Sequence, residues 1–180
     1  MTLNAADVQV GVTGAIYVAP FGTTAPTAED SVLAGAFADL GYAGEDGVTE
    51  KRDRSSDKIK AWQGARVVRE TVTESSLSYS FTLIETNRRT VTAYYGTAPD
   101  GSGRLVVDPS ANGGRKAWVI DVMDGAKLTR IYVPEGEVTA VGEQKYKNGE
   151  PIGYEVTITA YPSSAISGGS AVKFYGDLAA

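Results

Sequence analysis

The chain has 180 residues, 42% of them hydrophobic and 22% charged, a composition typical of one folded domain. Its 22 acidic and 17 basic residues give a net charge of −5, which argues against tight sequence-independent binding of nucleic acid. Because it has no cysteine and no histidine, disulfides, thiolate metal sites and catalysis by an imidazole are excluded. We expect a non-enzymatic protein with no cofactor and no metal.

The amino terminus lacks the basic start and continuous apolar run of a signal peptide. No stretch approaches the ~18 apolar residues that would indicate a membrane helix. We therefore expect a soluble protein without a membrane partner.

Alternation of apolar and polar residues outweighs helical spacing, and Val, Ile and Tyr are prominent in the apolar set. This pattern predicts a mainly β, antiparallel protein. Residues 1–12 have no sustained pattern and predict an amino-terminal arm. Strands are predicted at 15–19, closed by Pro20, and at 37–43.

The cleanest alternation covers residues 76–83. The apolar set, which would face the core, is Leu77, Tyr79, Phe81 and Leu83. The hydroxyl set, which would face water, is Ser76, Ser78, Ser80 and Thr82. Residues 66–73 are predicted to be the antiparallel neighbour of this strand, with the connection near Glu74 and Ser75.

One helix is predicted within residues 86–96. Thr86 or Asn87 can cap its amino terminus, and Gly96 can end it. Between them, Val91, Tyr94 and Tyr95 share one face by three- and four-residue spacing.

The second half of the chain predicts hairpins. In AWVIDVMDGAKLTRIYV, a two-residue turn at Asp124-Gly125 would pair Val122 with Lys127. The same register places Asp121 diagonal to Arg130, within reach of an ion pair.

Two further features follow towards the carboxy terminus. Asn148-Gly149 predicts a turn, and residues 154–162 alternate as a strand with one apolar face. Residues 163–180 read as a carboxy-terminal arm or an edge strand, so that residues 13–162 form the single β domain.

Acidic residues do not gather into a site with a recognisable chemistry. Asp121 and Asp124 are three apart on a strand and so face opposite ways, which does not suit a metal. Glu70, Glu74 and Glu85 are carboxylates, but their spacing gives no support for the paired arrangement of a glycosidase.

Residues 45–64 form a mixed-charge segment, predicted to be a loop, that can mate with a copy of itself; a solvated hairpin or a mobile loop is the alternative. Its nearly balanced charges are Glu45, Asp46, Glu50, Lys51, Arg52, Asp53, Arg54, Asp57 and Lys58. Trp62 lies just beyond them, and an exposed tryptophan commonly anchors an interface.

Taken in order, seven segments resemble the major tail tube proteins of long, non-contractile-tailed (siphovirus-type) bacteriophages, particularly those infecting actinobacteria. They are VGVTGAIYVAPFGTTAPT, LGYAGEDGVTE, IKAWQGARVVRE, FTLIETNRRTVTAYYG, KAWVIDVMDG, RIYVPEGEV and YEVTITAYP. The resemblance covers most of the chain and lies in the order of the segments.

The resemblance implies an antiparallel β-sandwich or barrel subunit with one flanking helix. Copies would form six-fold rings that stack into a hollow tube, the conduit for DNA ejection. By position, residues 45–64 correspond to the loop that locks one ring to the next, residues 86–96 to the helix outside the barrel, and residues 1–12 and 163–180 to the arms. Partners would be the chain itself, other tail proteins at the tube ends and, in passing, DNA. The location would be the virion tail, and the host cytoplasm during assembly.

A lumen requires a wet face without clustered cations, because cations would hold the phosphates of passing DNA. The face formed by Ser76, Ser78, Ser80, Thr82, Glu155, Thr157 and Thr159 meets this requirement. It equally fits the solvated face of any antiparallel sheet. Two other functions stay open: a β-sandwich module that binds a carbohydrate or receptor, and the tube protein of a secretion or contractile injection machine.

Overall fold

The computed structural model describes residues 3–176 and contains a single antiparallel sheet with eight strands. The strands are β1 (Thr13–Pro20), β2 (Ala38–Asp39), β3 (Ala43–Lys60), β4 (Val67–Leu83), β5 (Lys116–Asp124), β6 (Lys127–Val141), β7 (Tyr154–Ala160) and β8 (Val172–Tyr175). The helices are α1 (Arg88–Tyr95) and two short 3₁₀ turns, Ala5–Asp7 and Ser164–Ile166. Strands follow the order β2-β1-β5-β6-β7-β4-β3, and β8 pairs with β6. The prediction of a mainly β, antiparallel fold with one α-helix is confirmed for the described residues.

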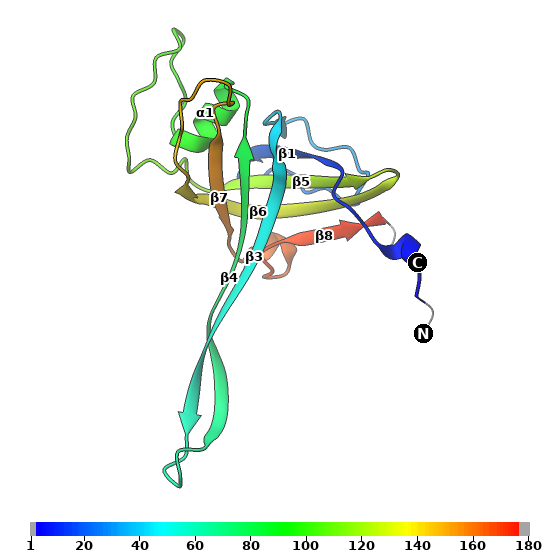
Figure 1. Cartoon of the computed structure of the whole chain (residues 1–180), viewed down its shortest axis with the longest axis vertical. Helices are drawn as coiled ribbons and strands as arrows, with labels where there is room; N and C mark the ends of the chain where they lie inside the picture. Colours follow the sequence, from blue (N-terminus) through cyan, green and yellow to red (C-terminus); the bar gives the residue numbers. More distant parts are fainter. Residues whose placement is uncertain (1–2, 177–180) are drawn as a thin grey trace.

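Strand β6 belongs to two differently oriented parts of the sheet. Its first half pairs with β5 and β8, and from Gly136 onward it pairs with β7. The register shifts by one residue between Val133 and Gly136, which is a β-bulge, and Pro134 within it has no N–H to donate. As a result β7, β4 and β3 run steeply across the direction of β5 and β6 (Figure 1).

The main core lies between these two parts of the sheet. Its buried members include Ile16, Leu40, Tyr79, Phe81, Leu83, Trp118, Ile120, Val133, Tyr154, Val156 and Ile158. The alternations predicted for residues 76–83 and 154–160 are confirmed, because β4 and β7 each turn their apolar side chains towards this core. The sheet therefore has an apolar inner face and, on β4 and β7, a polar outer face.

A second, smaller cluster covers the opposite face of β1, β5 and β6. Val119 and Tyr132 are buried there beneath Phe37 and Phe174. Beside them Asp121 and Arg130, only 4% and 6% exposed, form an ion pair with Oδ1···Nε at 2.7 Å and Oδ2···Nη2 at 2.8 Å. Arg130 Nη1 also donates to the carbonyl of Ser31 at 2.6 Å. The ion pair thus holds the segment between β1 and β2 against the sheet.

Helix α1 begins and ends as predicted. The Asn87 side chain accepts hydrogen bonds from the backbone N–H groups of Arg89 and Thr90, both at 2.9 Å, and Gly96 ends the helix in the left-handed conformation. Thr90 Oγ1 and Asn87 Nδ2 donate to the carbonyl of Leu40. These bonds tie the helix to the chain that leads from β2 into β3.

The prediction of one strand over residues 37–43 is wrong. Only Ala38–Asp39 pairs, and β3 begins at Ala43. Between them Gly41 has a φ of +89°, and its N–H is bonded to the Asp39 carboxylate at 2.8 Å. The chain turns here because Leu40 is fully buried in the core.

The predicted pairing of residues 66–73 with residues 76–83 is also wrong, because both belong to the single strand β4. Residues 67–76 of β4 pair instead with β3, which occupies most of the predicted loop 45–64. The sequence of β3 shows no alternation of apolar and polar residues that would predict a strand. Almost every residue from 51 to 60 is hydrophilic, because both faces of the strand are exposed there.

The hairpin of β5 and β6 forms with a register two residues away from the prediction. Val122 pairs with Thr129, and the turn is Gly125-Ala126. Gly125 has a φ of +59°, as the first position of a type II′ turn requires. Asp121 is consequently opposite Arg130 rather than diagonal to it, and the predicted ion pair is confirmed. The turn predicted at Asn148-Gly149 is confirmed as well.

Replacing Asp121 by Ala should lower the free energy of unfolding by about 3–5 kcal/mol, because the guanidinium of Arg130 would stay buried without a counter-charge. Urea denaturation monitored by near-UV circular dichroism measures this loss. Glu150→Ala is the matched control, since it breaks an exposed ion pair with Lys147 and should cost less than about 1 kcal/mol. Equal losses in the two variants would contradict a structural role for the buried pair.

Candidate assembly surfaces

The most prominent surface feature is a two-stranded ribbon that projects from the body of the protein (Figure 1). The pairing of β4 with β7 stops at Leu77, opposite Ala160. Beyond it, residues 53–60 of β3 and 67–76 of β4 pair only with each other, and all are exposed. The ribbon has no third strand and no packed face within the described chain.

A tight turn over residues 61–66 closes the ribbon. The Ala61 N–H donates to the Arg66 carbonyl at 2.8 Å, and Gly64 and Ala65 both have positive φ. Trp62 lies in this turn with 96% of its surface exposed. The expectation that Trp62 is borne on a loop, open to a partner, agrees with this position.

The charged residues predicted to contact another ring do not form one patch. Glu45 and Asp46 lie at the start of β3, beside a register shift. Trp62 is 17 residues further on than Glu45, which at ~3.3 Å per residue corresponds to roughly 55 Å of extended chain. Asp57 and Lys58 are on the ribbon, opposite Thr71 and Glu70, near the Trp62 end.

Residues 50–54 divide between the two faces of β3. Lys51 and Asp53 pair with Ser78 and Ser76, and the two charged side chains form an ion pair at 2.8 Å. The alternate residues, Glu50, Arg52 and Arg54, point to the other face. The sequence placed these residues in one segment but had no means to assign their faces, since a loop has no alternation.

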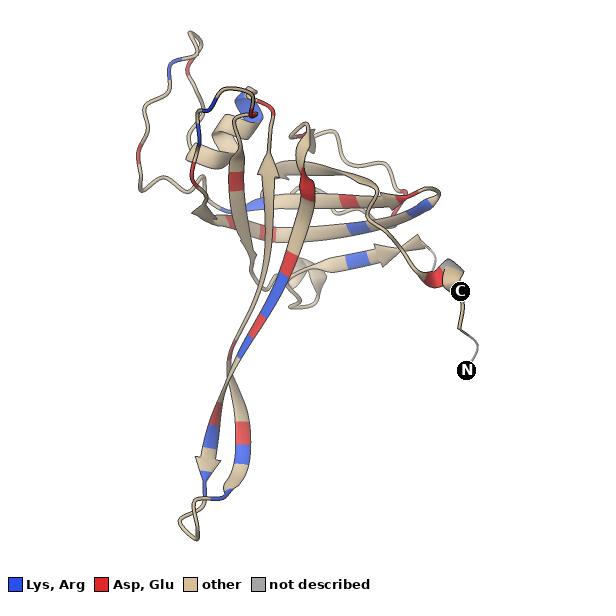
Figure 2. Cartoon of the chain, in the orientation of Figure 1, with Lys and Arg blue, Asp and Glu red and all other residues tan. Residues whose placement is uncertain are grey.

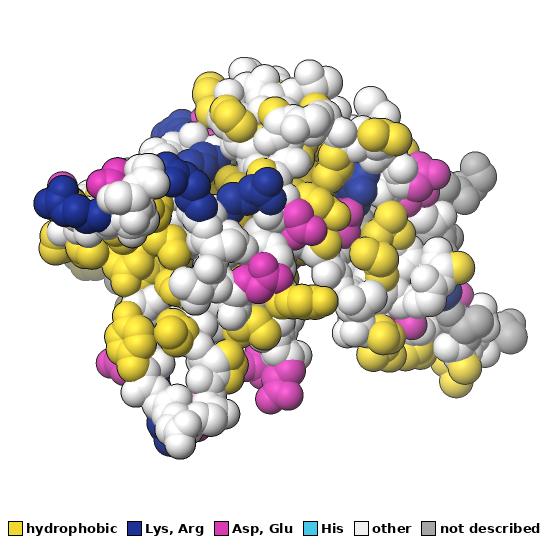
Figure 3. Space-filling view, turned by 90° about the horizontal axis from the view of Figure 1, so that it is seen from above, with side chains coloured by type: hydrophobic (Ala, Val, Ile, Leu, Met, Phe, Trp, Pro, Cys, Tyr) yellow, Lys and Arg dark blue, Asp and Glu magenta, His cyan; other side chains and the backbone are white. Residues whose placement is uncertain are grey.

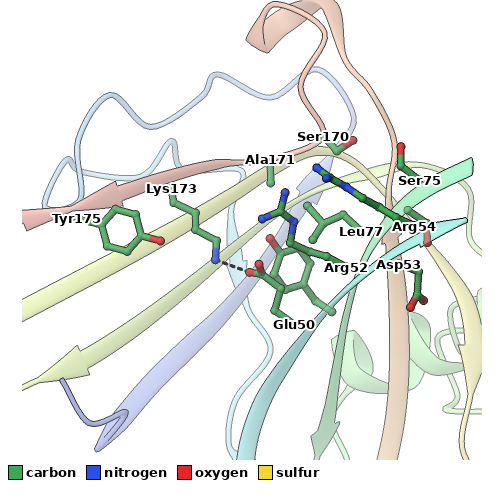
Figure 4. A pocket seen from close by; sticks show the side chains of 12 residues that line it. Glu50, Arg52, Asp53, Arg54, Ser75, Leu77, Ser170, Ala171, Lys173 and Tyr175 are labelled. Carbon is green, nitrogen blue, oxygen red and sulfur yellow. Dashed lines mark ion pairs between the residues drawn. The ribbon is translucent and has the colours of Figure 1, made fainter. Parts of the chain in front are cut away.

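The second of these faces opens into a groove of about 430 Å³ between the root of the ribbon and β8. Its lining includes Glu50, Arg52, Arg54, Tyr79, Lys173 and Tyr175 (Figure 4). Glu50 and Lys173 form an ion pair at 2.5 Å across it. Within the described chain, neither Arg52 nor Arg54 has an acidic partner at ion-pair distance. Asp53 lines the groove as well, so its two acidic and three basic side chains leave a net charge of only +1.

Tyr79 lies at the floor of this groove and is fully buried. Burial, and after it the negative charge of Glu50, raises the pKa of Tyr79 far above its usual value, so the phenol stays protonated. Its hydroxyl makes no hydrogen bond of normal geometry within the described residues, although it lies close enough to the Glu50 carboxylate for that side chain to contribute to the raised pKa. An unpaired buried hydroxyl costs stability.

The residues predicted to line a lumen lie together on the polar outer face of β4 and β7. Ser78 is opposite Thr159, Ser80 opposite Thr157, and Thr82 opposite Glu155. Ser80 and Thr157 share a hydrogen bond of 2.8 Å between their hydroxyls. Ser76 is exposed beyond the last pair of β4 with β7.

This polar face is wider than sequence reasoning indicated. Thr49 of β3 is opposite Ser80, and Glu137 of β6 is opposite Thr159. Thr139 Oγ1 lies 2.8 Å from Thr159 Oγ1. The bulges of β6 interrupt its period-two pattern, and for that reason its contribution was missed.

The segment before β1 is a further exposed surface. Leu3, Val8, Val10 and Val12 are largely exposed. The Val10 N–H donates to the Asp124 carboxylate at 2.9 Å, and the Val12 N–H to the Met123 carbonyl at 3.1 Å. Residues 1 and 2 of the predicted amino-terminal arm, and residues 177–180 of the carboxy-terminal one, lie outside the described residues.

No group of three or more acidic, histidine or cysteine side chains between residues 3 and 176 is arranged to hold a metal ion. The carboxylate of Asp121, which was considered from the sequence as a metal ligand, forms an ion pair with Arg130 instead. No helix in the same range is long and apolar enough to cross a membrane.

A long unpaired edge strand, a polar sheet face and a projecting ribbon are features of a subunit built to assemble with other chains. The chain belongs to the phage tail tube protein family, whose sequence model matches residues 1–169. It is therefore a structural tail tube protein. No curated protein matches the chain.

A solved structure has the same fold. A chain in the sheath–tube complex of an extracellular contractile injection system, PVC, in the extended state has a TM-score of 0.50 and 8% identity. The alignment covers 97% of this chain and 99% of that one. A chain in the virion of a native gene transfer agent particle gives a TM-score of 0.43 and 9% identity, with 97% and 98% covered.

Replacing Tyr79 by Phe should leave the free energy of unfolding unchanged or raise it, because the variant removes a buried hydroxyl that has no partner. Tyr154→Phe is the matched control, since its hydroxyl donates to Thr86 Oγ1 at 3.1 Å and its removal should destabilise the protein. Denaturant titration compares the two. A larger loss for Tyr79→Phe would mean that its hydroxyl is bonded in solution.

Proposed function

We propose that this protein assembles with copies of itself into stacked six-fold rings that form a hollow tail tube, and that the tube is the conduit for DNA ejection. The observation that carries the proposal is the free-standing ribbon of β3 and β4. An isolated two-stranded ribbon is marginally stable in water. This one nevertheless exposes Ile59, Trp62, Val67, Val68 and Val72. Packing against an adjacent ring would bury these side chains.

The edges of the sheet support ring formation. Strand β3 is the last strand of the sheet and pairs only with β4, which leaves a long edge open over the body of the subunit. An open edge of this length is a template for another strand. Edge-to-edge joining of copies closes the sheets into a barrel and removes the open edges.

The polar face of β4 and β7 suits the lumen of such a tube. Its hydroxyl rows offer hydrogen bonds to water, and Glu155 adds negative charge. Lys51, the cation on this face of β3, is neutralised by Asp53. A lining of this kind repels DNA phosphates or does not bind them, so DNA passes without being held.

The role is mechanical, without catalysis. Other tail proteins would bind the tube ends, assembly would take place in the host cytoplasm, and the siphovirus-type, actinobacteriophage origin rests on the resemblance described above. The alternative of a tube in a contractile injection machine is favoured by one observation, the fold shared with the PVC chain. A carbohydrate- or receptor-binding module is the remaining alternative, and it would stay small in solution.

Removing the ribbon should abolish tubes without unfolding the subunit. The variant deletes residues 55–74 and joins Arg54 to Ser75, its neighbour across the ribbon, through an Asn-Gly turn. Because the deleted residues touch neither core cluster, the melting temperature should change by only a few degrees. Negative-stain electron microscopy and sedimentation of concentrated protein are the measurements. Tubes formed by the truncated chain would show that the ribbon is dispensable, and a parent chain that stays monomeric at every concentration would refute the tube itself.

A cysteine placed on the polar face should be shielded in the tube. The chain has no cysteine, so Ser76→Cys and the control Thr97→Cys, just after α1, each carry one thiol. In free subunits both should react with small and with polymer-linked maleimides. In tubes the bulky reagent should modify only Thr97→Cys, because it cannot enter a lumen. Equal labelling of Ser76→Cys by the bulky reagent would place this face outside.

A further inference from the structure

We propose that Trp62 inserts into a pocket beside α1 on a second copy of the chain. The inference rests on the proposed function, since it names the surface that receives the ribbon. It draws on three observations: the chemistry of the ribbon tip, the shape and charge of the pocket, and their positions at opposite ends of the subunit.

The tip of the ribbon combines one exposed indole with a cluster of cations. Between residues 58 and 69 the chain carries Lys58, Lys60, Arg66 and Arg69 and no acidic residue. These four positive charges belong to a chain of net charge −5, so the other residues together carry −9. The four cations lie in or next to the turn that holds Trp62, and Asp57 and Glu70 follow directly behind them on the two strands of the ribbon, where acidic and basic residues adjoin (Figure 2).

The receiving pocket has a volume of about 380 Å³ and lies between α1, residues 107–112 and the end of β6. Its apolar lining includes Tyr94, Tyr95, Val107, Pro109, Val138 and Val141. Val107 and Val141 are about half exposed. Seen from the end that carries α1, the protein shows hydrophobic side chains at its surface among charged ones (Figure 3). An aromatic side chain entering such a pocket is the usual form of an interface hot spot.

The charge of this pocket matches the tip. Asp108 is the only charged residue of its lining. Hydrogen bonds from Ser110 lower the pKa of Asp108, so it is ionised at neutral pH. Glu137 accepts a hydrogen bond from the side chain of Asn112, another lining residue, and adds a second carboxylate at the rim. Lys60 and Arg66, which flank the turn that holds Trp62, would meet these carboxylates.

The groove at the root of the ribbon is a poor alternative for the same tip. Both acidic residues of its lining are already paired, Glu50 with Lys173 and Asp53 with Lys51. Four more cations would therefore meet a lining of net charge +1, in which Arg52 and Arg54 have no ion-pair partner among the described residues. Electrostatic complementarity therefore selects the pocket beside α1 over the groove.

The turn that closes the ribbon and helix α1, which lines the pocket, lie at opposite ends of the subunit (Figure 1). Trp62 cannot reach the pocket of its own chain, so the contact joins two copies. When two copies join through different surfaces, one copy keeps a free tip and the other keeps a free pocket. Further copies can therefore be added at either end of the assembly, along one axis. Growth along the tube is the expected result.

Two variants separate the tip from the pocket. Trp62→Ala removes an exposed side chain, and Val141→Lys places a cation at the edge of the pocket; both should leave the subunit folded. Each should raise the concentration needed for tubes at least ~10-fold. Mixed together, intact tips of Val141→Lys can enter intact pockets of Trp62→Ala, so paired rings should form but not tubes.

Fluorescence and cross-linking report the contact directly. The second tryptophan, Trp118, is already buried, so a blue shift on assembly reports Trp62. In a chain without native cysteine, Gln63→Cys with Ser110→Cys should give disulfide-linked ladders on a non-reducing gel. Gln63→Cys with Ser75→Cys, in the groove, is the matched control and should give none.

The outcomes distinguish this inference from the proposed function. Ladders from the Ser75 pair alone, or tubes of Trp62→Ala at the parental concentration, would overturn the assignment of the pocket and leave the tube intact. A parent chain that never assembles would overturn both.

Discussion

The bend of β6 at residues 134–136 is the constraint on which the rest of the structure depends. At this point Trp118 lies against Gly136, and its indole Nε1 donates to the Gly136 carbonyl at 3.1 Å. A side chain at Gly136 would begin only 2.5 Å from the indole, so the close approach requires glycine. The bend lets one strand serve two orientations, and the sheet folds over a single core.

This arrangement separates stability from assembly. Buried apolar side chains and the Asp121–Arg130 ion pair hold the body of the subunit. The ribbon, residues 53–60 of β3 and 67–76 of β4, contributes no side chain to either core cluster. The residues of the ribbon are consequently not constrained by packing in the core. They can be apolar or charged although exposed, and under the proposed function a second copy, rather than the core, would order them.

Two depressions of the surface differ in electrostatic character. The groove at the ribbon root is lined by two acidic and three basic residues, including two arginines without an ion-pair partner among the described residues, whereas Asp108 is the only charged residue that lines the pocket beside α1. A subunit with a cationic tip and an acidic receiving end has a direction. In the proposed contact, the opposite charges at the two ends of the subunit would favour head-to-tail stacking, whereas the net charge of the whole chain would predict only repulsion between copies.

The sequence by itself determined those features that depend on a few neighbouring residues. The Asn87 cap, the Gly96 stop and the alternation of β7 were predictable, because capping and side-chain periodicity act within one turn or one strand. Glu155, Thr157 and Thr159 were placed on one face for the same reason. The family resemblance, read from the order of the segments, agrees with the match to the phage tail tube family.

Only the tertiary structure decided the pairings between distant residues. It joined β3 to β4 rather than folding residues 66–83 back on themselves, and it set the turn at Gly125-Ala126. It also sent Arg52 to the groove and Lys51 to the polar face. Strand register and partner choice depend on which faces a core can bury, and a core assembles from residues far apart in the chain, so no local pattern contains that information.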